Sequence, residues 1–191
     1  DLSIPHSASL EWHVLFARSL AKSRDYESLQ ILFNAVNSWP EWWNGDWQVM
    51  AAEALRVNGE VDKAFAQLEG MPDQAPPKIT RALLFRDQDE PVKVGEEISE
   101  IDIESVDGYS HPEGEPSSVI FSLQSFIAYK EEDFEQAETL AREAIYRDHR
   151  SGVARLALSE ALKAEGKNAE AVEIVIEGLD RLPGQPDLTR N

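Results

Sequence analysis

The chain has 191 residues, with 18 basic and 36 acidic side chains, a net charge of −18 and no cysteine. An acidic surface repels nucleic-acid phosphates and anionic lipid, and the lack of cysteine excludes disulfides, thiol catalysis and zinc–thiolate sites. Its apolar runs are far shorter than the ~20 residues of a membrane helix. We therefore predict a soluble protein that binds no nucleic acid and does not insert into membranes.

The compartment is less constrained by composition. Cysteine-free chains occur both in the cytosol and outside it. The chain begins at Asp1 rather than Met, which indicates a processed product or an excised piece, so a targeting segment ahead of it would not be seen. We favour a cytoplasmic location over a periplasmic or secreted one.

Two pairs of amphipathic helices are predicted in the N-terminal part. Apolar positions keep helical spacing over residues 10–22 and again over residues 26–36. The runs 47–57 and 61–68 have the same spacing and form a second pair. These pairs predict a first repeat over residues 10–40 and a second over residues 46–72.

Four of the five tryptophans lie between these repeats, in residues 39–47. We favour rings that fill the seam between hairpins, because burying one ring removes ~150–250 Å² from water. The alternatives are an aromatic platform for a sugar, a peptide or a cation, and a docking patch by which the chain joins a larger assembly. The patch residues would be Trp42, Trp43 and Trp47.

The middle of the chain is acidic and irregular. Residues 73–116 hold 12 acidic and 4 basic side chains and half of the ten prolines. The run 79–85 fits either a helix or a buried strand, since periodicity over so few residues does not decide. We predict a degenerate hairpin here, followed by a mobile loop over residues 107–116.

An internal repeat marks the C-terminal part. Small and apolar residues recur there with an offset of 34 positions, namely Ala137, Leu140, Ala144 and Ile145, followed by Ala171, Ile174, Gly178 and Leu179. The second copy matches the spacing W-x2-L-G-x2-Y, A-x3-F and P with Arg155, Leu158, Ser159, Leu162, Ala171, Val175 and Pro183. In this pattern the chain resembles the tetratricopeptide repeat (TPR) family. The resemblance is degenerate, since Arg155, Ser159 and Leu162 stand in place of Trp, Gly and Tyr.

The resemblance implies an all-α, TPR-like solenoid of stacked antiparallel hairpins that forms one domain over residues 1–191. Its last two repeats would cover residues 117–149 and 151–183. Neither hairpin can bury its apolar face alone, so we expect the repeated residues to form the core between stacked hairpins.

Catalytic and metal sites are not indicated. The run from Asp87 fails as a calcium loop, because Val92 and Ile98 occupy the positions that need Gly and a bidentate Glu. The histidines lie too far apart for a helical metal pair, and we expect each to be a surface or boundary residue, namely His6, His13, His111 and His149. No nucleophile elbow surrounds Ser110 and no phosphate-binding glycine loop is present. We expect no enzymatic activity, no cofactor and no metal.

In TPR proteins the first helices of successive repeats line a concave groove, and fixed positions on them contact the ligand. The resemblance places there Val14, Arg18 and Lys22, then Val49, Glu53 and Arg56, then Ser122, Phe126 and Tyr129, and lastly Leu156, Glu160 and Lys163. The TPR clamp for heat-shock carboxylates is not expected, because Val14, Val49 and Leu156 replace its basic and amide residues. The apolar groove residues suit an amphipathic helix or an extended apolar peptide, or else pack on a neighbouring helix of the same chain.

The leading hypothesis is thus a non-enzymatic scaffold or adaptor that holds a peptide or partner protein, basic or amphipathic, in a concave groove. We then expect Val49, Phe126 and Leu156 to be accessible in the free chain. One alternative is a structural subunit or chaperone-like component that docks through residues 39–47. The other is a carbohydrate-binding module that uses the same tryptophans.

Overall fold

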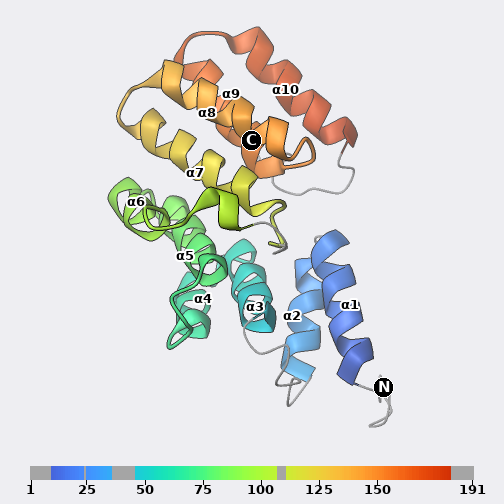
Figure 1. Ribbon diagram of the computed structural model, residues 1–191. Helices are drawn as coiled ribbons and strands as arrows, with labels where there is room; N and C mark the ends of the chain where they lie inside the picture. The colour runs from blue at the N-terminus through green and yellow to red at the C-terminus, as the bar shows by residue number, and fades with distance from the viewer. Residues whose placement is uncertain (1–9, 24, 36–45, 107–110, 182–191) are drawn as a thin grey trace. The chain divides into compact units, whose positions relative to one another are not determined.

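The computed structural model describes residues 10–23, 25–35, 46–106 and 111–181. Within these ranges the fold is helical and has no β-strand, only an isolated bridge between His111 and Gly114. Helices that follow one another in sequence pack as neighbouring pairs, in the manner of an α-helical solenoid (Figure 1). The predicted all-α class is therefore confirmed.

The contacts divide the chain into two compact units, Asp1–Pro72 and Asp73–Asn191, where the sequence predicts a single domain. Unit 1 contains α1 (Leu10–Ser23), α2 (Tyr26–Ala35), α3 (Asp46–Val57) and α4 (Val61–Leu68). Unit 2 contains α5 (Ala75–Asp87), α6 (Pro91–Ile98), the 3-10 helix η2 (Ile103–Ser105), α7 (Pro116–Lys130), α8 (Phe134–Arg147), α9 (Gly152–Ala164) and α10 (Asn168–Arg181). Each α-helix of unit 1 falls on an amphipathic run seen in the sequence.

Unit 1 has a core of its own between α1, α2 and α3. Val14, Ala17 and Leu29 are buried in it, as the helical spacing of apolar residues predicts. Trp47 is half-buried against this core, with its ring centroid 6.1 Å from that of Phe33 on α2. Trp47 thus packs between the first and second hairpins. Trp39, Trp42 and Trp43 lie outside the described residues.

The hairpins share one turn. In four of the described hairpins, one residue with a positive φ follows the first helix. These residues are Gly59 (φ 79°), Asp89 (φ 62°), Glu132 (φ 64°) and Gly166 (φ 80°). The next residue then donates its N–H to a carbonyl of the preceding helix, for example Lys167 to Leu162 at 2.8 Å and Asp133 to Ala128 at 2.9 Å. This is the Schellman-type helix end, which satisfies orphan carbonyls and favours glycine at the left-handed position. Glu132 and Gly166 are 34 residues apart, the offset of the sequence repeat.

Glu132 carries a side chain at a position where glycine is more stable. A left-handed conformation costs a non-glycine residue ~1 kcal/mol or more, so Glu132→Gly is expected to raise the free energy of unfolding by up to about 1 kcal/mol. Urea titration measures the change. The reverse substitution, Gly166→Ala, serves as the control and should lower stability by a similar amount; equal signs for both would contradict the assigned turn.

In unit 2, α7 and α8 approach closely through small residues. Ala137 and Ala144 are fully buried, as the repeat predicts. Two buried serines of α7 donate their hydroxyls to α8 carbonyls, Ser125 to Ala137 at 2.7 Å and Ser118 to Ala144 at 2.8 Å. Hydroxyls that reach the partner backbone require short side chains at these positions, which explains why serine is frequent on α7.

The acidic middle segment is ordered as a hairpin followed by a packed connector. By connector we mean the described residues between α6 and α7, 99–106 and 111–115. The run 79–85 lies within α5 and is helical, not a strand. After α6 the chain leaves the helical path, and Ile101, Ile103 and Val106 pack with Leu83 and α7 residues in the main core of unit 2. His111 and Glu113 are buried further along. Where described, the predicted mobile loop is therefore packed; residues 107–110 lie outside the described ranges.

The connector is also joined to the turn between α8 and α9. The Glu115 N–H donates to Asp148 Oδ2 at 3.3 Å, and Gly114 has a φ of 125°. A Cβ on Gly114 would lie 2.4 Å from the same carboxylate oxygen and would displace it, and the φ of 125° itself favours glycine.

Ion pairs join α8 to the last hairpin. Glu138 accepts from Lys167 Nζ at 2.6 Å and from Arg142 at 2.6 Å, and Arg142 also donates to Glu170 at 2.5 Å. The Lys167 hydrogen bond, aided by Arg142, lowers the pKa of Glu138 to about 2. Because Glu138 is mostly buried, this pair is screened less than a fully exposed one.

This depressed pKa predicts a pH-dependent contribution to stability. The charged form of Glu138 stabilises the fold above the ordinary pKa of 4.5, and the contribution is lost as pH falls from there to about 2. Glu138→Gln should cost about 1–2 kcal/mol at neutral pH and much less near pH 2. Urea unfolding of both proteins at the two pH values tests this, and a cost that does not change with pH would contradict it.

Candidate functional site

The left-handed turn residues fix the register of the first helices. In each first helix, the residues ten, six and three positions before the turn residue correspond from one hairpin to the next. In α7 they are Ser122, Phe126 and Tyr129, and in α9 they are Leu156, Glu160 and Lys163. These are the residues that the TPR resemblance places in the groove. The α7 and α9 helices are neighbours, and α7 also packs beside α5. The candidate site is therefore built on adjacent helices of unit 2.

The structure exposes only part of this predicted set. On α9, Leu156 is 36% exposed, and Glu160 and Lys163 are exposed. On α7, Phe126 and Tyr129 are half-buried, while Ser122 is buried and instead donates its hydroxyl to the backbone of Ser118 at 2.8 Å. We refer to the remaining accessible residues as the α7–α9 face, consisting of Phe126, Tyr129, Leu156, Glu160 and Lys163.

Most of the predicted residues of unit 1 are buried. Val14 belongs to the apolar core between α1 and α2, and Arg18 beside it is exposed. Val49 is 1% exposed, so the accessibility expected of it is wrong. Glu53 is fully buried and accepts a hydrogen bond from Arg56 Nε at 2.8 Å. The structure does not describe the side chain of Lys22.

The equivalent residues of α5 explain why the accessible area is small. Ile79 and Leu83 occupy the register positions of Leu156 and Glu160, and both are fully buried. They belong to the same apolar cluster as Ile101, Ile103 and Val106 of the connector. Apolar residues of these positions are thus covered by the chain itself in this hairpin, the alternative that the sequence left open.

Opposite charges lie close together at the α7–α9 face. Desolvation raises the pKa of Glu160, while the positive charges of Arg86, Lys130 and Lys163 act against this increase. Lys130 pairs with Asp89 at 2.5 Å, which raises the pKa of the lysine. The site therefore combines an apolar centre with both positively and negatively charged side chains.

Lys130 also lies over the aromatic rings of this face. Its ammonium is 5.5 Å from the ring centroid of Phe126 and 5.7 Å from that of Tyr129. Cations attracted to ring faces in this range hold both groups in place. The two rings are thus fixed at the C-terminal end of α7.

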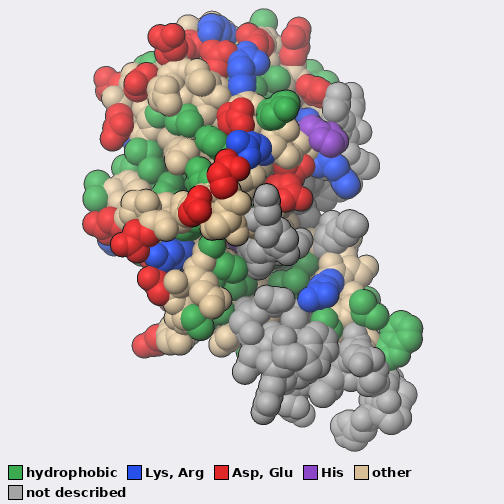
Figure 2. Space-filling model, in the orientation of Figure 1, with side chains coloured by type: hydrophobic (Ala, Val, Ile, Leu, Met, Phe, Trp, Pro, Cys, Tyr) green, Lys and Arg blue, Asp and Glu red, His purple; other side chains and the backbone are tan. Residues whose placement is uncertain are grey.

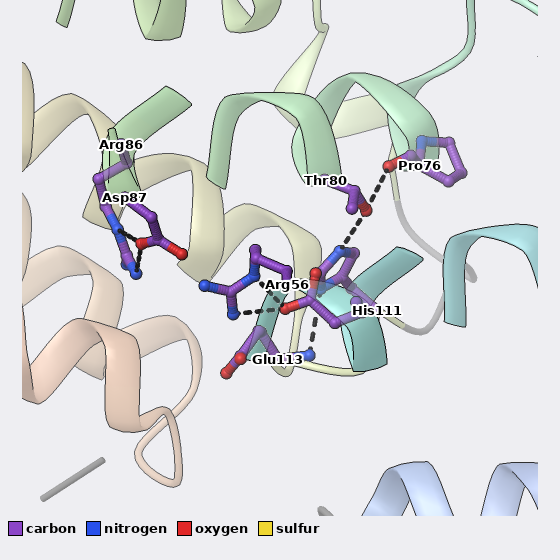
Figure 3. A network of polar contacts seen from close by, with 8 residues as sticks. Arg56, Pro76, Thr80, Arg86, Asp87, His111 and Glu113 are labelled. Carbon is purple, nitrogen blue, oxygen red and sulfur yellow. Dashed lines mark hydrogen bonds and ion pairs between the residues drawn. The ribbon is translucent and has the colours of Figure 1, made fainter. Parts of the chain in front are cut away.

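A second polar cluster surrounds His111, which sequence reasoning wrongly expected at the surface. The imidazole is 3% exposed and lies between the connector and α5 (Figure 3). Its Nδ1 accepts the backbone N–H of Glu113 at 3.1 Å, and its Nε2 lies 3.1 Å from Thr80 Oγ1. Thr80 donates to the Pro76 carbonyl at 3.3 Å, so Nε2 carries the proton and donates to Thr80. These two hydrogen bonds of the imidazole hold the connector against α5.

Candidate metal ligands do not form a cluster in the described residues. His149 is exposed and His13 is half-buried, while His6 lies outside the described ranges. A search of the described part of the chain finds no group of three or more His, Asp or Glu side chains that could hold a metal ion. In the same part, none of the helices combines the length and apolarity needed to cross a membrane.

Comparison with protein-family models and with curated proteins gives no match for this chain. The features that carry a functional argument are therefore the repeated turn, the helix pairs and the α7–α9 face.

Proposed function

We propose that this chain is a non-enzymatic interaction scaffold of the TPR type, which binds a peptide or a segment of a partner protein at the α7–α9 face. The support for the repeat family is the common left-handed turn, which recurs at a 34-residue spacing between the last two hairpins. Repeat arrays of this kind present surfaces built from equivalent positions of successive helices.

One observation carries the choice of face. Leu156 stays 36% exposed on α9, the neighbour of the helix that carries the half-buried rings of Phe126 and Tyr129, although Ile79 and Leu83 of α5 are fully buried at the positions equivalent to Leu156 and Phe126. Apolar side chains that remain accessible among the predicted groove positions of two adjacent helices favour contact with a ligand. The ligand that fits is a peptide with apolar side chains, flanked by charges of both signs that complement Glu160 and Lys163.

Selection from a displayed peptide library with the purified chain tests this proposal. We expect enrichment of peptides that combine apolar and charged residues, and we expect them to bind less well to a chain carrying Leu156→Ser and Lys163→Glu. Peptides that bind this double variant as tightly as the parent would place the binding surface elsewhere.

A further inference from the structure

A second surface lies on α10. It is found by aligning the second helices of the hairpins on the same turn residues. In unit 2, the residues six positions after the turn residue are Gly95 on α6, Glu138 on α8 and Val172 on α10. A Cβ at Gly95 would lie 3.8 Å from Ile127 Cδ1 of α7, and Glu138 accepts from Lys167. In α6 and α8 this position therefore meets the hairpin that follows.

In α8 the position ten residues after the turn residue also meets the next hairpin. It is Arg142, which donates to Glu170 of α10 at 2.5 Å. In α10 the same position is Ile176. The two junction positions of α8 are thus charged and paired with the next hairpin, while those of α10 are apolar.

Both α10 residues are widely exposed. Val172 is 57% and Ile176 is 52% exposed, and Ala169 on the same side of the helix is also exposed. We refer to these three residues, spaced i, i+3 and i+7, as the α10 stripe. Such a stripe on a helix is the pattern that normally packs against another helix. Val172 and Ile176 occupy the two positions through which α8 contacts the hairpin that follows it.

Acidic side chains border the α10 stripe. Glu173 and Glu177 are exposed and directly follow Val172 and Ile176 in the sequence. Acidic groups are also spread over the visible surface of unit 2, and the whole chain carries a net charge of −18 (Figure 2). A helix that covers the stripe would therefore place its own flanking residues beside carboxylates.

We propose that the α10 stripe docks an amphipathic helix of a partner protein, whose apolar face is edged by Lys and Arg. The apolar residues of the partner would cover Val172 and Ile176, and its cations would face Glu173 and Glu177. The ion pairs of Glu138 and Arg142 join α8 to the last hairpin by the same combination of register and opposite charge. A second copy of this chain is a poorer occupant, because two α10 helices would bring like charges together.

A fluorescently labelled synthetic peptide serves as the probe. It is ~18 residues long, five helical turns at 3.6 residues each, with leucine on one face and lysine and arginine beside it. The matched peptide has glutamate in place of the basic residues. Fluorescence anisotropy measures the affinity of each peptide for the full chain. We expect the basic peptide to bind at least tenfold more tightly, with weaker binding as salt increases.

The variants separate the stripe from the general acidity of the surface. Val172→Ser with Ile176→Ser removes apolar area without changing charge, and it should weaken binding of the basic peptide at least tenfold. The matched control is Ile31→Ser with Val92→Ser, two other exposed apolar residues, at 62% and 74% exposure. It should leave the affinity unchanged.

Three outcomes would overturn this inference. The first is unchanged binding to the Val172→Ser, Ile176→Ser variant. The second is loss of binding in the Leu156→Ser, Lys163→Glu variant instead, which would assign the probe to the α7–α9 face and leave the proposed function standing. The third is concentration-dependent dimerisation of the parent, seen in sedimentation velocity and abolished by the two serines, which would make a second copy the occupant.

Discussion

Replacing Leu83 with alanine is expected to lower the free energy of unfolding of unit 2 by ~2–5 kcal/mol, the range for a leucine removed from a closed core. Leu83 is fully buried, in the cluster where α5, α6, α7, α9 and the connector meet. The cavity would lie among residues from all of these segments, so little collapse could fill it. Urea unfolding followed by circular dichroism measures the change.

Val92→Ala is the matched control for this prediction. Val92 lies on α6, in the same hairpin, and is 74% exposed, so its loss should cost less than ~0.5 kcal/mol. Equal small effects at both positions would mean that residues 73–116 do not belong to the core of unit 2.

The second large effect concerns binding. Exchanging Leu156 for serine and Lys163 for glutamate should reduce affinity for a selected peptide by about threefold to tenfold. A ligand can bury only the exposed 36% of Leu156, so about a third of the ~1.5–3 kcal/mol of a whole apolar side chain is lost, and ~1.4 kcal/mol is one decade. Lys163 is exposed, so a decrease in melting temperature would come from Leu156, and affinities are compared below the melting temperatures of both proteins. Isothermal titration of the peptide gives the affinity.

Phe126 is less suitable for this test than the sequence indicates. It packs partly against the main core of unit 2, so Phe126→Ser should lower stability as well as binding. Tyr146→Ser, at a residue 82% exposed on α8, is the control for a general surface effect. Equal loss of affinity in the Tyr146→Ser control would remove the argument for the α7–α9 face.

Helix positions were accessible from the sequence because their signals are local. The 3.6-residue spacing of apolar residues marks α1 to α4, and a side-chain cap begins α9, where Ser151 Oγ accepts the Ala154 N–H at 3.2 Å. The offset of 34 residues predicts the last two hairpins from the sequence alone.

The connector was not predictable, since its contacts are distant in sequence. Alternation of Ile101 and Ile103 with acids indicates an extended segment but not what the isoleucines touch. The buried His111 depends on Thr80, 31 residues earlier, and a single histidine has no pattern that reveals such a partner. The acidic composition of this segment indicates a loop, whereas its apolar residues pack on α5 and α7.

The turn residues agree with the register of the predicted groove positions, but the accessibility of these positions differs from the expectation. The family pattern gives equivalent positions such as Val49, Ser122 and Leu156, yet only Leu156 is exposed. Coverage depends on what the rest of the chain places over each helix, and this information is absent from a motif. The exposure of Val172 and Ile176 was missed for the same reason, because both residues have the apolar character of a core.

Photo-crosslinking tests the central claim, binding at the α7–α9 face, most directly. Benzoylphenylalanine would replace Tyr129 on this face in one protein and Val92 on α6 in another, and each would be irradiated with a selected peptide. The account predicts a crosslink from position 129 that excess unlabelled peptide abolishes, and none from position 92. A crosslink from position 92 alone, or none at position 129 while the peptide is bound, would contradict it.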